Sequence, residues 1–475
     1  MVVYDLKYMG PFLRMNTLKS DTIEKQLFFL AKESLRYLVL NSKCGIPVPS
    51  SELKNKSFPN FDINTIGVFS PLLCIYKKGS PKLINIGGGL CFDEDSLKKE
   101  LTIEANGFMT LALLEMVDYY FKFKDINNKK YSVGTGYLLL SKKQLEFYAA
   151  NLRNIEGVFV DKKHLEGFKQ DNFKFEEKNK KFKFSEQALL MAAYYRYSLY
   201  DESAVGEEYK NFALDIFNMF LELKDDLYTY SYEELTKLSF YINLFYSYSK
   251  LPEANLLALD VMEYISENLK DTAHIRIEDD IEIDCLFLLN CLISYKNTDI
   301  LKFKETSQKL YSKLLELYIP ENGIFIKSDD KKECVYSSVE IVLYLLSVTS
   351  YIKVFGSNKE ANMIIIDIFK RQLVDSGIIL SWPVSPDLDD IERYRNFTSK
   401  SEDLIEEQEF RMPNLPTPDS VDMAPIFIKN ITYNKKKESF TQSKLTFDSS
   451  KNMFIYFLII YLQKAFPDNV EEEKN

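Results

Sequence analysis

The stretch that decides the fold is Asn322-Gly323-Ile324-Phe325, followed by the apolar run from Ile341 to Tyr351. The tetrapeptide is typical of a turn that leads into a short extended apolar pair. The run after it is apolar on every side of a helix, which indicates a helix surrounded by protein. The segment before it, 299–318, is amphipathic and carries its lysines on one side. One unit therefore consists of a half-exposed helix, a turn and a buried helix.

This unit recurs along the chain. Between the later turns, at 227, 274, 323 and 377, the steps are 47, 49 and 54 residues, and insertions lengthen the earlier steps. A repeat of about fifty residues with two helices is the mark of stacked helical hairpins. The other turns with an extended pair are Cys44-Gly45-Ile46, Glu156-Gly157-Val158-Phe159, Asp226-Leu227-Tyr228, Ala273-His274-Ile275 and Ser376-Gly377-Ile378-Ile379. The expected helices are 21–42, 102–124, 141–153 (with Ser141 as its cap), 185–201, 205–223, 232–250, 253–270, 280–297, 299–318, 336–355, 358–375 and 450–466.

Six half-exposed helices alternate with six buried ones, and a closed ring needs no capping repeats at its ends. The pattern, with turns such as Asn322-Gly323-Ile324-Phe325, resembles the (α/α)6 toroid of the six-hairpin glycosidase-like superfamily. The resemblance concerns architecture and brings no catalytic motif with it. It implies an all-α, single-domain chain over 1–475, with small β elements in the loops at one end. The same ring also serves polysaccharide lyases, sugar epimerases and prenyl-chain enzymes, so fold alone does not choose a reaction.

Composition excludes some functions. The chain has 475 residues and a formal net charge of -10, which disfavours a nucleic-acid partner. The N-terminal sequence lacks the pattern of a signal peptide, and the apolar run from Met453 to Leu462 is too short to cross a membrane. The six cysteines are scattered without metal-ligand spacing, which favours buried thiols in a reducing compartment. We therefore expect a cytoplasmic protein without a membrane partner.

The long connections mark one end of the ring as the functional end. The insertions at about 46–101, 158–184 and 380–449 all join an outer helix to the following inner helix, whereas the reverse connections are short. In the toroid that the sequence resembles, these connections emerge together, where the inner helices begin. Binding sites favour loops on a rigid frame. In the first insertion, Gly87-Gly88-Gly89 is better interpreted as a strand-end turn than as a phosphate loop.

Sugar hydrolysis needs two carboxylates. We expect Glu104 and Glu186 to be the catalytic pair, because each precedes a largely apolar helix and would have a raised pKa at a narrow ring centre. The opposing interpretation is that acidic residues at helix starts only favour the helix dipole. Other inner-helix starts offer Glu233, Glu234, Asp280, Glu282, Asp284 and Glu340.

The third insertion adds further candidates. It opens with the only tryptophan, Trp382, which could stack on a sugar ring together with Tyr394. Asp387 and Asp389 could act as acid or base. The alternative is that Trp382 packs a loop and that both aspartates are solvated turn residues.

The sequence points to a site without metal or cofactor, because only His164 and His274 are present and the acidic cluster 279–284 does not match a calcium loop. Two functions remain. The first is a glycoside-hydrolase-like enzyme that acts on an intracellular or small saccharide. The second is a non-catalytic binding or scaffold protein that presents its aromatic, charged insertions to a protein partner.

Overall fold

A computed structural model describes residues 18–48, 52–53, 70–165, 173–178, 182–271, 281–327, 331–442 and 444–467. Twelve helices were predicted, and for eleven of them both ends lie within three residues of the ends of an observed helical segment. The helices are α1 (Ser20–Leu40), α2 (Ile103–Phe121), α3 (Asn128–Asn151), α4 (Phe184–Ser198), α5 (Ala204–Glu222), α6 (Lys224–Leu227), α7 (Tyr232–Ser249), α8 (Pro252–Asp271), α9 (Ile281–Thr298), α10 (Leu301–Glu316), α11 (Ser338–Phe355), α12 (Lys359–Asp367), α13 (Pro418–Val421) and α14 (Ser449–Ala465). A π-helical segment, Ile368–Val374, continues α12.

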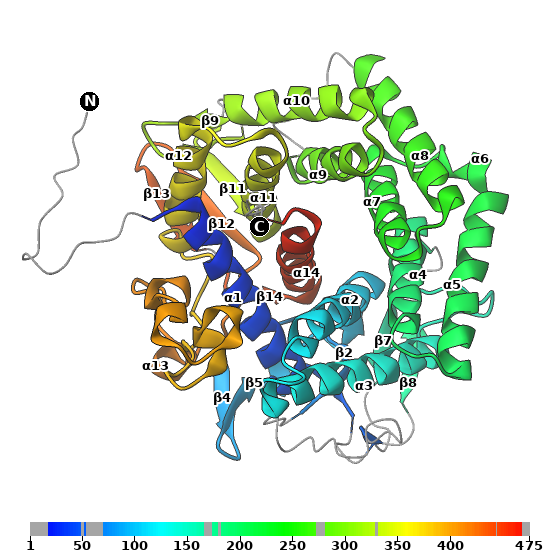
Figure 1. The fold of residues 1–475 in the computed structure, drawn as a ribbon, viewed down its shortest axis with the longest axis horizontal. Coiled ribbons are helices and arrows are strands. Elements are labelled where there is room, and N and C mark those ends of the chain that lie inside the picture. Colours follow the sequence, from blue (N-terminus) through cyan, green and yellow to red (C-terminus); the bar gives the residue numbers. More distant parts are fainter. Residues whose placement is uncertain are drawn as a thin grey trace, which may run out of the picture.

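The inner helices form a closed ring. In chain order, the inner helices are α2, α4, α7, α9, α11 and α14. Each of them packs on the next, and α14 packs on α2, which closes the ring. Figure 1 looks along this ring and shows α3, α5, α8, α10 and α12 outside it. The first outer helix, α1, packs against α14, α2 and α12. The structure thus confirms six helical hairpins arranged as a toroid.

Burial separates the two sets of helices as the pattern predicted. In α5, one of the outer helices, the buried side chains are confined to one stripe. In α11 nearly every position is buried. Within the part of the chain that the structure describes, α11 is also the one helix long and apolar enough to cross a membrane, but 78% of that window is buried inside the protein. Its apolar character is therefore that of a core helix.

The prediction for α3 was wrong at its start. The helix begins at Asn128, where the Asn127 side chain accepts the Lys130 N–H, and Ser141 lies in its middle. This first half contains Gly134 and Gly136, which have low helix propensity. A Cβ on Gly134 would approach Tyr120 and Phe121 to 2.9 Å, so the glycine allows α3 to lie close against α2.

Small sheets occupy the loops at the end where the inner helices begin. The strands are β1 (Gly45–Pro47), β2 (Leu72–Ile75), β3 (Lys78–Gly79), β4 (Leu83–Ile86), β5 (Gly89–Phe92), β6 (Glu100–Leu101), β7 (Lys162–Leu165), β8 (Lys174–Glu177), β9 (Tyr318–Ile319), β10 (Ile324–Phe325), β11 (Glu333–Ser337), β12 (Asn430–Asn434), β13 (Ser439–Gln442) and β14 (Phe447–Asp448). Their sheets are β1–β2, β4–β5, β9–β10, β3–β14, β6–β7–β8 and β11–β12–β13, and every pairing is antiparallel. The glycine run at 87–89 turns β4 into β5, as expected.

One of the predicted extended pairs, at 226–228, is wrong. Residues 226–228 overlap the short helix α6, because Asp225 and Asp226 lie in its first turn, where the helix dipole favours acidic residues. Residues 156–159 form a turn with one bridge between Arg153 and Phe159. The pair at 273–275 lies outside the described residues.

Buried amides fix the extended segments to the helices. Asn106 on α2 accepts the Ile75 N–H at 2.9 Å, and Asn452 on α14 accepts the Phe427 N–H at the same distance. Gln187 on α4 likewise accepts the Phe159 N–H at 2.9 Å and donates to its carbonyl. Because buried polar groups must be satisfied, each amide holds one loop in register with one inner helix.

At the opposite end of the ring, where the inner helices finish and which we call the narrow end, charged side chains of α2, α4 and α14 pair with one another. Arg196 donates to Glu115 at 2.9 Å and to Asp118 at 2.6 Å. Lys464 from α14 contacts the same two carboxylates at 3.1 and 2.7 Å. Only 1% of the Glu115 side chain is exposed. Burial disfavours a charged Asp118, but Arg196 and Lys464 outweigh it and lower the pKa of that carboxyl.

Candidate functional site at the mouth of the ring

The mouth is the end at which the six inner helices begin. Five of these helices carry a glutamate at their second or third residue: Glu104, Glu186, Glu233 with Glu234, Glu282 and Glu340. The sixth, α14, carries Ser450 and Lys451 there. Closure of the ring therefore brings carboxylates from separate hairpins to one end.

Two of these glutamates hold the helix starts. Glu234 accepts both the backbone N–H and the hydroxyl of Ser185, each at 2.9 Å, and so ties α7 to α4. Glu340 accepts the Ser337 N–H at 2.7 Å in a capping box and pairs with Lys327 at 2.6 Å. Their hydrogen bonds account for them as structural groups.

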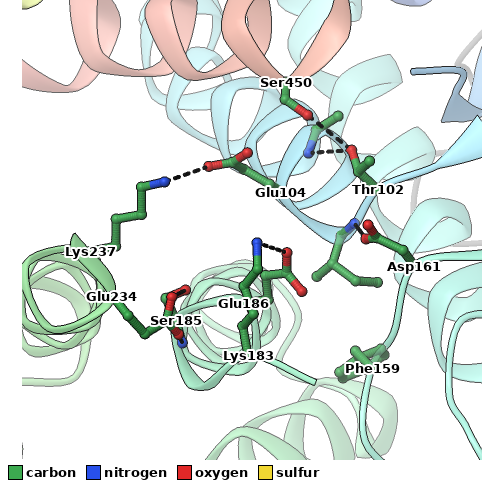
Figure 2. A network of polar contacts seen from close by, with 12 residues as sticks. Thr102, Glu104, Phe159, Asp161, Lys183, Ser185, Glu186, Glu234, Lys237 and Ser450 are labelled. Atoms are coloured by element: carbon green, nitrogen blue, oxygen red, sulfur yellow. Dashed lines mark hydrogen bonds and ion pairs between the residues drawn. The ribbon is translucent and has the colours of Figure 1, made fainter. Parts of the chain in front are cut away.

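The other glutamates, Glu104, Glu186 and Glu282, pair more loosely. Glu104 lies 3.8 Å from Lys237 of α7, and Glu186 lies 3.2 Å from Lys183, which is mostly exposed. Glu282 reaches Lys451 only at 4.0 Å. Figure 2 shows Glu104 and Glu186 turned toward the space between α2, α4 and α7.

Glu186 has the most unusual electrostatics of the group. Its side chain is 11% exposed. Burial raises the pKa of Glu186 to about 7, and the neighbouring charges of Asp161 and Glu104 act in the same direction against Lys183. Burial also raises the pKa of Glu282, with help from Glu104. A carboxyl that titrates near neutral pH can both donate and accept a proton.

The neighbouring loop supplies a further carboxylate. Asp161 accepts the Ile103 N–H at 3.0 Å, at the first residue of α2 (Figure 2). Thr102 caps the same helix and shares a 3.0 Å hydrogen bond with Ser450 of α14. Asp161 therefore fixes the start of α2 and adds negative charge beside Glu186.

Aromatic side chains fill the ring directly below the mouth. Phe108, one helical turn after Glu104, contacts the rings of Tyr241, Phe454 and Phe457 at centroid distances of 5.6, 4.9 and 5.2 Å. The ring is therefore a packed core below its first layer of side chains, and the polar groups stand on an aromatic floor.

Comparison with solved structures identifies the architecture. A structure described as D-mannose isomerase aligns with 94% of this chain and 100% of its own, at a TM-score of 0.51 and 8% identity. The chain is an (α/α)6 toroid. A cellobiose 2-epimerase from Bacillus thermoamylovorans B4167 is less similar, with a TM-score of 0.48 and 8% identity over 82% of this chain and 92% of that chain. The cellulase Cel9M of C. cellulolyticium in complex with cellobiose has a TM-score of 0.47 and 10% identity over 94% of this chain and 98% of that chain. No protein-family model and no curated protein matches the chain.

The structure separates Asp387 and Asp389 from this toroid mouth, which corrects the expectation of one shared site. Both are exposed and line a cavity of about 360 Å³ beside Arg36 and Lys130.

The adjoining Glu392 accepts a hydrogen bond from the hydroxyl of Tyr119 at 2.8 Å. Tyr119 lies 15 residues beyond Glu104 on α2, or about 22 Å along the helix axis. The third insertion runs along α1 toward the narrow end, where Lys32 and Lys130 lower the pKa of Glu392 to about 2 against the effect of burial.

The aromatic candidates of this insertion also lie away from the toroid mouth. Trp382 is 2% exposed, and its indole N–H donates to the Phe410 carbonyl at 2.7 Å. Tyr394 donates its hydroxyl to the Leu388 carbonyl within the same loop. Trp382 thus packs the loop, and its ring has no open face for a sugar.

Sequence reasoning missed Lys237, Asp161 and Tyr241 as members of the mouth. Lys237 follows Glu233 by four residues, a spacing that signals an ion pair, and the two are 2.8 Å apart. No comparable signal marks Asp161, which reaches the site through a loop. Among the described residues, no cluster of three or more His, Cys, Asp or Glu is arranged to hold a metal ion. All six cysteines are buried, as expected.

Proposed function

We propose that the mouth of the toroid binds a saccharide and that Glu186 exchanges a proton with it, so that the protein is a carbohydrate-active enzyme. The observation that carries the proposal is that Glu104 and Glu186, from two hairpins, face the same space, where burial and the charge of Glu104 help raise the pKa of Glu186 to about 7. Perturbed carboxyls of this kind cluster at functional sites. The similarity to D-mannose isomerase supports the architecture of the proposal and leaves the reaction open.

Within this proposal, Glu186 is the general acid. Protonated Glu186 can give its proton to the leaving oxygen as the bond between that oxygen and the sugar carbon breaks, and its carboxylate can then take a proton from the water whose oxygen bonds to the same carbon. Glu104, held beside Lys237, is the second carboxylate that glycoside hydrolysis requires. Hydrolysis of a small saccharide is the reaction that this pair favours.

The test is incubation of the pure protein with neutral mono- and oligosaccharides, followed by proton NMR. Hydrolysis gives new reducing-end signals, whereas isomerisation changes the monosaccharide spectrum without cleavage. Glu186→Gln is expected to lose at least 100-fold in rate, in the range that general acid–base catalysis contributes.

Glu207→Gln is the matched control. Glu207 lies in the first turn of the outer helix α5 and pairs with Lys210 at 3.6 Å. Like Glu186 and Lys183, the two residues are three positions apart in the chain. The control should keep full activity. Equal activity of the two variants would contradict the role of Glu186.

A non-catalytic binding protein is the second candidate, favoured by the aromatic packing of Phe108, Phe454 and Phe457 below the mouth. This candidate gains if no saccharide reacts or raises the melting temperature of the protein.

A further inference from the structure

The hydroxyl of Tyr241 is a buried polar group that no other described residue satisfies. Tyr241 is 2% exposed, and its hydroxyl has no hydrogen-bond partner among the described residues. A buried polar group without a partner costs about 1–3 kcal/mol, so such a group calls for a physical reason.

The position of Tyr241 is directly below the mouth. It follows Lys237 by one helical turn on α7, as Phe108 follows Glu104 on α2, and the two rings contact each other edge-on. Side chains on a helix tilt toward its N-terminus, which for every inner helix is the mouth. Burial raises the pKa of the Tyr241 hydroxyl, and the mouth carboxylates Glu104, Glu234, Glu186 and Glu282 act in the same direction. The hydroxyl therefore faces up, toward the candidate site.

The corresponding positions on the other inner helices are filled differently. Tyr241 lies two turns below Glu233, and two turns below the mouth residues of other inner helices stand Ala112, Val348 and Leu458, all buried and apolar. Tyr194 of α4 and Asn290 of α9 occupy the same level, but the Tyr194 hydroxyl donates to the Leu145 carbonyl at 2.7 Å and the Asn290 amide donates to the Ser239 hydroxyl at 2.8 Å. At these positions, Tyr241 thus contributes the hydroxyl that remains available to a ligand.

A ligand can displace the ion pair between Glu104 and Lys237, which lies above Tyr241. The Glu104–Lys237 pair that joins α2 to α7 there is 3.8 Å long, and 31% of the Glu104 side chain is exposed. Ion pairs that are long and partly solvated contribute little to stability. A polar ligand can replace this contact at small cost and reach the hydroxyl below.

We propose that Tyr241 is a ligand contact at the floor of the mouth, where its hydroxyl forms a hydrogen bond with a hydroxyl group of an uncharged saccharide. The proposal rests on the proposed function and adds a residue that determines specificity. The surrounding carboxylates accept hydrogen bonds from neighbouring hydroxyls of the same sugar.

The experiment compares wild type, Tyr241→Phe and Tyr137→Phe. Tyr137 is also fully buried with a hydroxyl that lacks a partner among the described residues, but it packs on Tyr120, near the narrow end of α2. Each protein is melted alone and with D-glucose, D-mannose, cellobiose and mannobiose. Titration calorimetry then gives the affinity for the sugar with the largest shift.

Without sugar, Tyr241→Phe is expected to melt at the wild-type temperature or above, because the substitution removes an unsatisfied hydroxyl. Its affinity for the sugar is expected to fall about tenfold, as for the loss of one hydrogen bond. Tyr137→Phe should keep the wild-type affinity.

Three results would overturn the inference. Unchanged affinity in Tyr241→Phe, with a wild type that binds sugar, removes Tyr241 and leaves the proposed function intact. A fall of several degrees in the melting temperature of sugar-free Tyr241→Phe shows that the hydroxyl has a structural partner. A wild type that binds none of the four sugars removes the proposed function and this inference together.

Discussion

The two ends of the ring use the same residue types to opposite effect. At the narrow end, Glu115 and Asp118 face Arg196 and Lys464, each cation contacts both carboxylates, and the pKa of Asp118 is lowered. At the mouth, Glu104, Glu186 and Glu282 meet their lysines at 3.2 to 4.0 Å, and the pKa values of Glu186 and Glu282 are raised. The narrow end is thus neutralised, and the mouth keeps an excess of negative charge.

This difference separates a structural network from a candidate site. Matched charges stabilise the fold, whereas crowded carboxylates cost stability and persist where a function needs them. We therefore expect the reaction to take place at the mouth and the stabilising ion pairs to lie at the narrow end.

The largest expected effect lies at the narrow end. Arg196→Met should lower the free energy of unfolding by about 3 kcal/mol or more, because it leaves Glu115 buried with Lys464 as its remaining partner. Urea denaturation of wild type and variant measures this loss. A change below about 1 kcal/mol would show that the narrow end is not the stabilising network.

The second effect has the opposite sign and lies at the mouth. Because folding raises the pKa of Glu186 to about 7, its contribution to stability is fully present below pH 4.5 and is lost as the pH rises through 7. Glu186→Gln mimics the protonated form, so it should stabilise the protein by about 3 kcal/mol at pH 8 and hardly at all at pH 4.

Melting curves of wild type and Glu186→Gln between pH 4 and 8 give this dependence. Glu234→Gln serves as the contrast, since its carboxylate accepts two hydrogen bonds from Ser185 and its loss should destabilise the fold. A stabilisation of Glu186→Gln that did not vary with pH would contradict the raised pKa.

The sequence predicted the fold well because periodicity reports burial. Helices such as α5 and α11 reveal by their apolar pattern whether they face solvent or protein, and alternation of the two kinds indicates a ring. The prediction failed where a close contact overrode propensity, as at Gly134, whose missing side chain allows α3 to approach α2.

The candidate site was predicted only in part. Glu104 and Glu186 could be named because they begin inner helices, and ring closure then brings such starts together. Asp161 and Tyr241 could not, since their places depend on a loop path and on packing between helices. Trp382 and Asp389 were misplaced because the insertion that carries them returns along α1, a course that only its contacts with Lys25, Gln26 and Lys32 reveal.

The third effect concerns the charge of the ligand. The excess of carboxylates at the mouth should repel anions, so glucuronate or glucose 6-phosphate should bind at least tenfold more weakly than the uncharged sugar that binds best. Calorimetric titrations at pH 8, where Glu186 is mostly ionised, measure the contrast. Equal affinities would show that the mouth carboxylates do not face the ligand.

The smallest effect is expected where the sequence alone suggested catalysis. Asp389→Asn removes an exposed charge from the cavity beside Arg36 and Lys130, at the far end of α2 from Glu104. Exposed charges contribute little to stability, so the variant should unfold within about 0.5 kcal/mol of wild type and keep the wild-type affinity for sugar. A loss of sugar affinity in Asp389→Asn but not in Glu186→Gln would place the ligand at the narrow end. It would thereby reverse the assignment of the two ends, because the neutralised end would then bind and the crowded carboxylates of the mouth would need another explanation.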